Sequence, residues 1–447
     1  MALSRRSFLN GLAVAPIGAL AGVSVRRATA STQTLRADAA ALRQRIEALS
    51  VFGRPAGGSF ADGVSRVAYS DADVAGRKYV MDLMRAASLE PRVDPAGNIF
   101  GHRPGTDSSL PPILFGSHID SVPSGGNFDG DLGSLAALAA IEACDRASHR
   151  TRHPLEMVVW SAEEGVAFGR GLAGSRIVAG DVKPADMDAV WNGLRRGDAV
   201  RKIGGAPDRI MDAVRRKGAH HCYLELHIEQ GGTLERGGMP VGVVEGIVAI
   251  ERYTAVVTGF ANHAGTTPMP ERQDALVGAS LLTVAVREAV TKGPGRQVGT
   301  VGQLEVTPNA PNVIPGSVRL TIELRDLSTE KLRGIIDDLR GRARQIADQT
   351  RTQIEITDLS RNPPALASPE VQRVIERAAS KLSLGSTRLP SGAGHDAQMM
   401  AQLGPMGMIF VPSVAGISHS PKELTRWEDC ANGANMLLQT VLEMDNQ

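Results

Sequence analysis

The chain has 447 residues, of which 42% are hydrophobic, and it is long enough to form two domains with separate cores. Its 49 basic residues nearly balance its 48 acidic residues, and only 4% of the residues are aromatic, so composition gives no basis for nucleic-acid binding. We therefore expect the substrate to be a small molecule or a peptide.

The first thirty residues have the features of an export signal. Residues 4–10, SRRSFLN, contain an adjacent arginine pair, and a modest apolar stretch at 11–25 leads to the small-residue cleavage site at 28–30. A membrane anchor is the alternative, but this stretch is short and rich in Gly, Ala and Pro. We expect residues 1–30 to be a twin-arginine signal peptide that directs the folded protein to the periplasm, without stable membrane insertion.

Helices and strands alternate along the first part of the mature chain. Apolar residues recur at helical spacing over residues 35–49 and 71–87, and residues 92–102 have the pattern strand, turn, strand. A short apolar strand at 113–115 then leads into a loop and an alanine-rich helix at about 132–147.

Four apolar runs of strand length are each followed by side chains of the kinds that bind zinc-type metals. One such coincidence would be ordinary, but four favour a common site at one edge of a sheet, where the ends of neighbouring strands meet. The runs and the residues after them are 113–115 with His118, Asp120 and Asp129, 155–161 with Glu163 and Glu164, 222–226 with His227, and 406–412 with His419.

Each of these residues also has a purely structural interpretation. The loop aspartates could cap a helix, and Glu163 and Glu164 could form a solvated acidic turn. His227 lies between apolar neighbours and could be a core histidine, while His419 could cap a helix that begins near Lys422. The position of all of them after apolar strands is what favours the metal interpretation.

A change of pattern between the third and fourth runs indicates an inserted domain. Residues 241–259 and 317–325 alternate apolar and polar positions as half-buried strands do, and residues 274–291 and 329–349 have helical spacing. We therefore predict an α/β fold, in which a mostly parallel or mixed sheet is flanked by helices and a smaller α+β domain is inserted into it. The expected limits are 31–242 and 362–447 for the larger domain and 243–361 for the inserted one.

Such a set of side chains can hold two metal ions for the hydrolysis of an amide-like bond. Two ions about 3.5–4 Å apart activate a water and polarise a carbonyl, and they need a bridging carboxylate between terminal His and carboxylate ligands. Asp129 is the candidate bridge, and Asp120 is placed to accept a hydrogen bond from His118 and fix its tautomer. Of Glu163 and Glu164, a turn at the following glycine would let one bind metal while the other acts as general base.

Eight motifs occur in order along the mature chain: GSHIDSV, NFDG, SAEEG, LELHIEQG, GFANHAGTTPM, PNVIPG, SGAGHDA and GISHSPKE. Together they resemble the amidase/carbamoylase branch of the M20 metallohydrolases, which includes N-carbamoyl-L-amino-acid hydrolases, β-ureidopropionases and allantoate amidohydrolases. Peptidases of the wider family usually carry Asp in place of His227, so the HIEQG motif favours the amidase branch.

The resemblance implies a dinuclear catalytic domain with two divalent ions per subunit. Zinc is the first choice, although His and carboxylate ligands also accept manganese, cobalt or nickel. Glu163 would be the acid/base. The implied ligands are His118, Asp129 and His227 for one ion, and Asp129, Glu164 and His419 for the other.

The resemblance also implies that the inserted domain is a lid that forms a homodimer. His263 would reach the partner's site and stabilise the oxyanion, a contribution of about a few kcal/mol. The implied substrate-binding residues are Gln230, Asn312, Arg325 and His395. From the residues alone, Arg325 could equally be a surface ion-pair residue or capture a substrate carboxylate, and His395 could cap a helix at Asp396.

The expected activity is hydrolysis of the carbamoyl group of N-carbamoyl-L-amino acids or similar ureido acids, with release of ammonia and carbon dioxide. Allantoate or ureidoglycolate hydrolysis, an M20-type exopeptidase, and a binding protein that has lost catalysis are the alternatives. Two departures from the usual motifs, Ala167 before Phe168 and Asp131 inside the metal loop, leave the shape of the substrate open.

Overall fold

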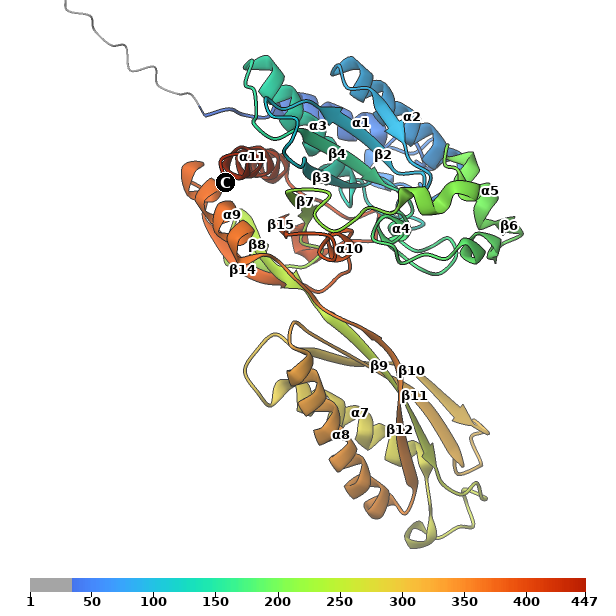
Figure 1. Cartoon of the computed structure of the whole chain (residues 1–447). Helices are drawn as coiled ribbons and strands as arrows, with labels where there is room; N and C mark the ends of the chain where they lie inside the picture. The colour runs from blue at the N-terminus through green and yellow to red at the C-terminus, as the bar shows by residue number, and fades with distance from the viewer. Residues whose placement is uncertain (1–33) are drawn as a thin grey trace, which may run out of the picture. The chain divides into compact units, whose positions relative to one another are not determined.

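The computed structural model describes residues 34–447, and the expected signal peptide at 1–30 lies outside the described residues. Within the part that is described, no helix is both long enough and apolar enough to cross a bilayer. Figure 1 shows the sheet and the helices that position the site.

Side-chain caps define where several helices begin. Asp38 accepts a hydrogen bond from the Ala41 amide at the start of the first helix, which is why this helix begins four residues later than the expected 35. Ser328 caps the long helix of the inserted domain in the same way. The helices are α1 (Ala39–Leu49), α2 (Asp71–Ala86), α3 (Asp131–Arg146), α4 (Ala173–Val178), α5 (Arg196–Lys202), α6 (Thr233–Gly237), α7 (Ala275–Thr291), α8 (Thr329–Thr350), α9 (Pro369–Lys381), α10 (Ala397–Met400) and α11 (Trp427–Met444).

A nine-stranded mixed sheet forms the larger domain, in the order β1-β2-β4-β3-β7-β15-β8-β13, with β14 paired to β8. Its four central strands, β4, β3, β7 and β15, are parallel to one another, and the outer pairs are largely antiparallel. The strands of this sheet are β1 (Pro91–Val93), β2 (Ile99–Arg103), β3 (Ile113–His118), β4 (Leu155–Trp160), β7 (Cys222–Ile228), β8 (Val241–Ile247), β13 (Ala365–Leu366), β14 (Ser386–Ser391) and β15 (Met406–Val411), and a separate hairpin consists of β5 (Val190–Trp191) and β6 (Leu194–Arg195).

Helices cover both faces of this sheet (Figure 1). Apolar side chains of α1, α2, α3, α9 and α11 form one buried cluster with one face of the strands. A second cluster on the opposite face contains residues of α4 and α10. All four central strands are therefore buried on both sides, as their continuous apolar sequences predicted.

The inserted domain has a separate four-stranded antiparallel sheet, in the order β10-β11-β9-β12. Helices α7 and α8 pack on it and form a core of its own with the strands. Its strands are β9 (Ala249–Thr258), β10 (Val298–Thr307), β11 (Ser317–Asp326) and β12 (Gln353–Asn362).

The point at which the chain enters the inserted domain differs from the expected residue 243. Residues Val241–Ile247 form β8, which pairs with β15 and β14 in the larger sheet. The chain passes to the second sheet between Ile247 and Ala249, and it returns between Asn362 and Ala365. The alternating pattern of 241–259 spans two strands that belong to different sheets, and the pattern alone does not distinguish them.

Candidate active site

The ends of the four central strands meet around one cavity of about 220 Å³. This arrangement confirms the expectation that four strand ends share one edge of a sheet. Most of the residues expected in the site line the cavity, namely His118, Asp129, Glu163, Glu164, His227, Gln230, His395 and His419.

Asp129 lies at the centre of this cluster, and its two oxygens face different partners. Oδ1 lies 3.5 Å from Nε2 of His118 and 3.1 Å from Nε2 of His227. Oδ2 lies 3.3 Å from Nε2 of His419, which lies 3.3 Å from Oε2 of Glu164. Asp129 is thus shared by two groups of three residues, and within each group the ligand atoms lie within 4.8 Å of one another, so each could hold a metal ion.

Backbone carbonyls orient two of the histidines. Nδ1 of His118 lies 3.0 Å from the carbonyl oxygen of Asp120, and Nδ1 of His227 lies 2.9 Å from the carbonyl oxygen of Ile228. A carbonyl only accepts hydrogen bonds, so each Nδ1 carries the proton and each Nε2 keeps its lone pair for the centre of the cavity.

The expected role of the Asp120 side chain needs correction. Its Oδ1 is 3.9 Å from Nδ1 of His118, so the tautomer is set by the Asp120 main chain and not by its carboxylate. The carboxylate instead accepts hydrogen bonds from the amides of Glu163, at 3.0 Å, and Glu164, at 3.2 Å. Asp120 therefore joins the loop after β3 to the loop after β4, because the turn after β4 directs its amides toward this carboxylate.

Three residues that follow strands of the site have left-handed backbone. Ala162, Gln230 and His419 have φ values of 52°, 56° and 54°. Such conformations cost of order 1–3 kcal/mol for a residue with a side chain and cluster at functional sites. After β4, this turn brings Glu163 and Glu164 to the same cavity although neighbours in a strand would face opposite sides.

A glycine is required at position 130, directly after Asp129. Its φ is 67°, and a Cβ at this position would lie 2.5 Å from the ring of His118. Any side chain there would displace the imidazole, which explains the glycine of the NFDG motif.

Burial and neighbouring charges shift the pKa values of the acidic residues in the cavity. Burial, followed by the charge of Asp129, raises the pKa of Glu164 to about 8. Burial also raises the pKa of Glu163 well above its ordinary value, with Asp396 and Glu164 adding to the effect. Burial by itself would raise the pKa of Asp129, but the neighbouring histidines His118, His227 and His419 outweigh it and hold this pKa well below its usual range.

A pair of divalent cations fits this donor set. Nε2 of His227 and Oε1 of Glu164 are buried and have no hydrogen-bond partner among residues 34–447, as ligand atoms without their ions would. Three imidazoles and two carboxylates are ligands that zinc and its neighbours accept.

Three further residues hold Asp129, and only one of them was expected in the site. Nε2 of Gln230 donates to Oδ2 of Asp129 at 2.8 Å, and the Ser418 hydroxyl lies 3.1 Å from the same oxygen. Oε1 of Glu423 accepts the amide of Asp129 at 3.1 Å, and its Oε2 accepts the Ser418 hydroxyl at 2.8 Å. Ser418 and Glu423 lie in the GISHSPKE motif, which was the signal that could have identified them.

His395 packs edge-on against His227, with ring centroids 4.4 Å apart. Its Nε2 is 2.9 Å from the Ser391 hydroxyl, and burial holds its pKa well below the ordinary value. The imidazole is therefore neutral, and it lines the cavity instead of capping α10.

Comparison with known proteins agrees with this geometry. Residues 114–443 match the Peptidase family M20/M25/M40. The chain belongs to this family. Among its relatives, an N-carbamoyl-L-amino acid amidohydrolase of Geobacillus stearothermophilus is 38% identical over 90% of this chain and 98% of the relative. A ureidoglycolate hydrolase of Arabidopsis thaliana is 37% identical over 92% of this chain and 87% of the relative.

The fold also matches solved structures of M20 amidases. A hydantoinase/carbamoylase family amidase from Burkholderia multivorans superposes with a TM-score of 0.87 at 33% identity, covering 93% of this chain and all of that one. The M20 chain is therefore a hydrolase in the amidase/carbamoylase branch, acting on carbon–nitrogen bonds other than peptide bonds.

Arg325 of this M20 chain borders a second cavity, of about 650 Å³, which shares Gln230 and Ala393 with the first. Its guanidinium lies 2.7 Å from Oε1 of Glu323 and donates to the carbonyl oxygen of Gly392 at 2.6 Å. Both interpretations of Arg325 thus have a structural counterpart, since it forms an ion pair and also borders a cavity that shares Gln230 and Ala393 with the cavity of the candidate metal ligands.

His263 and Asn312 do not join the other residues. Both are exposed on the inserted domain, where the Ala264 amide donates to the carbonyl oxygen of Asn312 at 3.0 Å and His263 pairs with Val313. Neither lines the cavity of its own chain. His263 and Asn312 are therefore close to each other, but neither lines the cavity that contains the candidate metal ligands.

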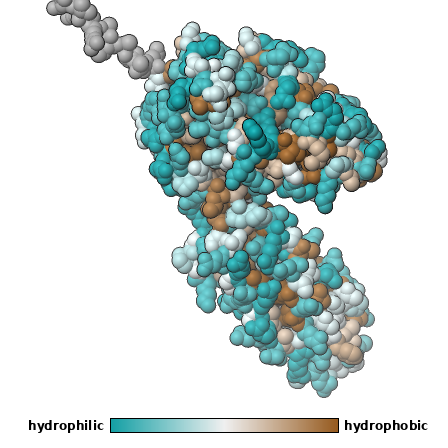
Figure 2. All heavy atoms as spheres, in the orientation of Figure 1, coloured by the Kyte–Doolittle hydropathy of each residue, from teal (hydrophilic) through white to brown (hydrophobic). Residues whose placement is uncertain are grey.

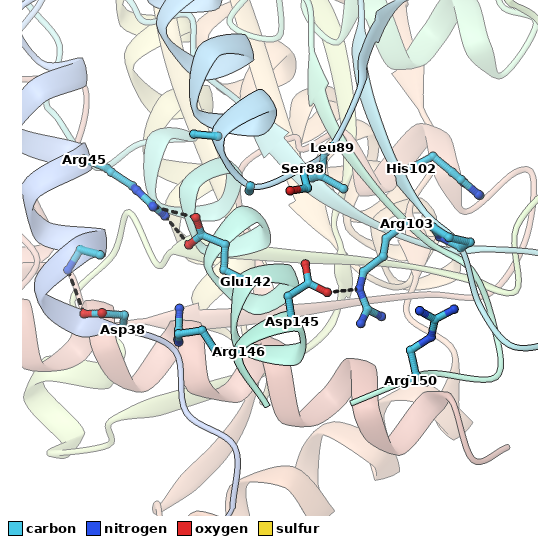
Figure 3. Close-up of a pocket in the computed structure, with 14 residues that line it drawn as sticks. Asp38, Arg45, Ser88, Leu89, His102, Arg103, Glu142, Asp145, Arg146 and Arg150 are labelled. Atoms are coloured by element: carbon cyan, nitrogen blue, oxygen red, sulfur yellow. Dashed lines mark hydrogen bonds and ion pairs between the residues drawn. The ribbon is translucent and has the colours of Figure 1, made fainter. Parts of the chain in front are cut away.

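A further hollow, of about 570 Å³, lies between the ends of α1, α2 and α3 (Figure 3). Its arginines are largely engaged, since Arg45 pairs with Glu142 at 2.6 Å and Arg103 pairs with Asp145 at 2.7 Å. None of the residues expected in the site lines it, so the reaction chemistry belongs to the cavity at the strand ends.

Proposed function

We propose that this M20 chain hydrolyses the carbamoyl group of N-carbamoyl-L-amino acids, with release of ammonia and carbon dioxide. The observation that carries the proposal is the position of Glu163, a buried carboxylate that belongs to neither group of metal ligands but lines the same cavity. A relative with this activity in its name is 38% identical over nearly the whole chain, which supports the choice of substrate.

The residues around the cavity divide the work of the reaction. When bound, two divalent ions supply an activated water and polarise the scissile carbonyl. Glu163 takes a proton from the attacking water and hands it to the leaving nitrogen, a role open to a carboxylate that lines the cavity without belonging to either group of candidate ligands. Nε2 of His118 lies 3.7 Å from Oε2 of Glu163, so this carboxylate lies directly beside the candidate ligands.

The substrate carboxylate is expected to lie toward Arg325. A guanidinium can bind a carboxylate through two parallel hydrogen bonds, and the donors that Arg325 does not use for Glu323 and Gly392 remain for a ligand. Gln230 lines both cavities and would contact the substrate between the carboxylate and the carbamoyl group.

Ureidoglycolate or allantoate is the second candidate substrate, and one observation favours it. The cavity beside Arg325 is also lined by Arg296, Arg388 and Thr387, while Leu389 and Pro390 are its larger apolar contacts. A polar lining of this kind suits a short acidic substrate better than an aromatic or long aliphatic side chain.

We infer that the protein acts as a homodimer through its inserted domain. Large apolar side chains are exposed there, including Val277 and Val284 on one face of α7 and Val298 and Leu304 on the edge strand β10, and Figure 2 shows apolar surface on this part of the chain. Exposed apolar residues and an unpaired strand edge are features of interaction surfaces. A partner would also supply His263, which does not reach the cavity of its own chain.

Zinc as the resident metal and export by the twin-arginine pathway are also proposals. The ligand set supports zinc without excluding manganese, cobalt or nickel. The support for export is the arginine pair in residues 4–10. Cell fractionation would test it, since Arg5→Lys/Arg6→Lys should leave the full-length protein in the cytoplasm, whereas unchanged periplasmic protein would contradict it.

Ammonia release tests the proposed activity. Purified residues 31–447 would be stripped with a chelator, reloaded with zinc or manganese, and offered N-carbamoyl-L-amino acids, ureidoglycolate, allantoate and dipeptides. Glu163→Gln should lower kcat by about 10²- to 10⁴-fold while the bound metal stays at two ions per subunit, because a general base and not a ligand is removed. The exposed Glu90→Gln is the matched control and should retain activity.

The same assay separates the alternatives. Metal-dependent cleavage of dipeptides without ammonia would assign an exopeptidase. Ligand binding with no turnover, unchanged by Glu163→Gln, would assign a binding protein.

A further inference from the structure

Arg66 is a buried arginine that contacts the chain just after His118 and just after Asp129. Arg66 lies before α2, is 1% exposed, and its Nε donates to the carbonyl oxygen of Ile119 at 2.6 Å. Its own amide donates to the Ser121 hydroxyl at 2.9 Å, and the Ser121 amide donates back to its carbonyl at 3.0 Å. Arg66 therefore contacts two residues of the loop that follows His118, namely Ile119 and Ser121.

The same guanidinium is also anchored on the other side. Nη1 donates to the carbonyl oxygens of Leu49, at 3.0 Å, and Phe52, at 2.9 Å, where α1 ends. Nη2 forms an ion pair with Asp131, and both side chains of this pair are 1% exposed. Each of the three guanidinium nitrogens of Arg66 thus has a partner, and the partners come from three different segments of the chain.

Asp131 links Arg66 to Asp129, the residue shared by the two groups of candidate ligands. It is the first residue of α3, and its amide donates to the carbonyl oxygen of Asp129 at 2.7 Å. Only Gly130 separates the two aspartates, so a shift of Asp131 must shift Asp129. The same guanidinium thus contacts Ile119, which follows His118, and Asp131, which lies two residues after Asp129.

Stability alone does not account for a buried pair of this kind. Replacing a buried ion pair by apolar residues of similar volume is often neutral or stabilising, whereas removal of one partner is costly. A charged pair can, however, fix the relative position of two loops. The planar guanidinium constrains both the direction and the length of the hydrogen bonds that it donates.

We propose that Arg66 and Asp131 form a positioning pair that sets the distance between His118 and Asp129 and thereby tunes metal affinity. Neither residue touches the substrate or the reacting atoms. The proposal rests on the proposed function only in taking Asp129 as the shared ligand.

The test replaces the pair by apolar residues of similar size, Arg66→Met/Asp131→Leu. The matched control is Arg45→Met/Glu142→Leu, which removes the ion pair at the far part of the same helix α3 (Figure 3). Zinc affinity is measured by competition with a chromogenic chelator, and the free energy of unfolding is measured in urea with the metal removed. Neither readout requires turnover.

The expected result is a loss of zinc affinity of about tenfold to a hundredfold in the folded Arg66/Asp131 variant, and no change of affinity in the control. The metal-free stability of this variant should fall, because the carbonyls of Ile119, Leu49 and Phe52 lose their donor. Wild-type affinity in a folded Arg66→Met/Asp131→Leu variant would overturn the proposal.

If the double variant does not fold, Arg66→Lys decides. Lysine keeps the charge but cannot reach all of the carbonyls that the guanidinium contacts, so the affinity should still fall. Unchanged affinity in Arg66→Lys would overturn the proposal, because charge alone would then suffice. A wild-type protein that binds zinc but releases no ammonia would refute the proposed activity and leave this test intact.

Discussion

His220 is a buried imidazole whose two ring nitrogens have no hydrogen-bond partner within residues 34–447. Burial, followed by the charge of Arg215, lowers its pKa from 6.5 to about 4. The unfolded chain takes up this proton below about pH 6.5, whereas the folded chain does so only near pH 4, so His220 lowers stability as the pH falls between these values.

We therefore expect His220→Phe to reduce the acid sensitivity of the fold. Relative to pH 7.5, the variant should lose about 2 kcal/mol less stability than wild type at pH 5, because the penalty for keeping this imidazole neutral is absent. Urea unfolding of the metal-free protein at both pH values measures the difference. The exposed His102→Phe serves as the control, and parallel pH profiles for wild type and His220→Phe would contradict the assignment.

At the residue scale, the sequence predicted which side chains meet in the cavity better than it predicted the residues that hold them in place. His118, Asp129 and His227 follow apolar strands, and their residue types alone limit the chemistry available to them. The partner of Asp120 depends on the direction in which a turn presents its amides, which no local pattern encodes. Arg66 has no pattern at all, because its partners are backbone carbonyls of segments far apart in the sequence.

At the scale of elements, the backbone of α3 lies so close to the sheet at Gly133 that a residue with a side chain would not fit there. A Cβ on Gly133 would lie 2.2 Å from the carbonyl oxygen of Leu226 and 2.8 Å from Cβ of Ser117. These contacts belong to the strands that carry His227 and His118. The glycine is thus what lets the helix pack directly behind the ligands.

Gly133→Ala should destabilise the protein by about 1–3 kcal/mol, although alanine is the better helix former, because overpacking outweighs propensity here. Gly334 in α8 is the matched control, since a Cβ there meets no atom within 4 Å. Gly334→Ala should stabilise by about 0.5–1 kcal/mol. Urea unfolding measures both, and stabilisation by Gly133→Ala would show that α3 can move away from the sheet.

The elements themselves were predicted unevenly. The helices α1, α2, α3, α7 and α8 and the four central strands were predicted from their apolar patterns, and the structure contains them within a few residues of the expected limits. No limits were predicted for α9 and α11. The passage between the two sheets was misplaced because β8 and β9 have similar patterns and differ only in their partners. Strand pairing is a non-local property, so alternation in one segment does not report it.

At the scale of the whole molecule, the exposed position of His263 leads to a test of shared sites. If His263 acts in the partner's cavity, a chain with Glu163→Gln and a chain with His263→Ala each form inactive homodimers. In a mixed dimer, the His263→Ala chain retains Glu163 and receives an intact His263 from its partner.

Mixing the two variants after reversible dissociation should therefore restore activity to about a quarter of the wild-type value, since random pairing gives half mixed dimers with one competent site each. Ammonia release before and after mixing measures this. Each variant alone, carried through the same procedure, is the control. No gain on mixing would place the action of His263 within its own chain or remove it from the reaction.

The two connections between the sheets have a consequence for how such a protein could arise. Ile250 pairs with Asn362 at the start and end of the inserted domain, and Ile247 pairs with Ala365 in the larger sheet. The chain thus leaves the larger sheet and returns to it at neighbouring positions. An ancestral hairpin between β8 and β13 could have acquired the whole insertion, or lost it, without any change in the order of the strands that carry the ligands.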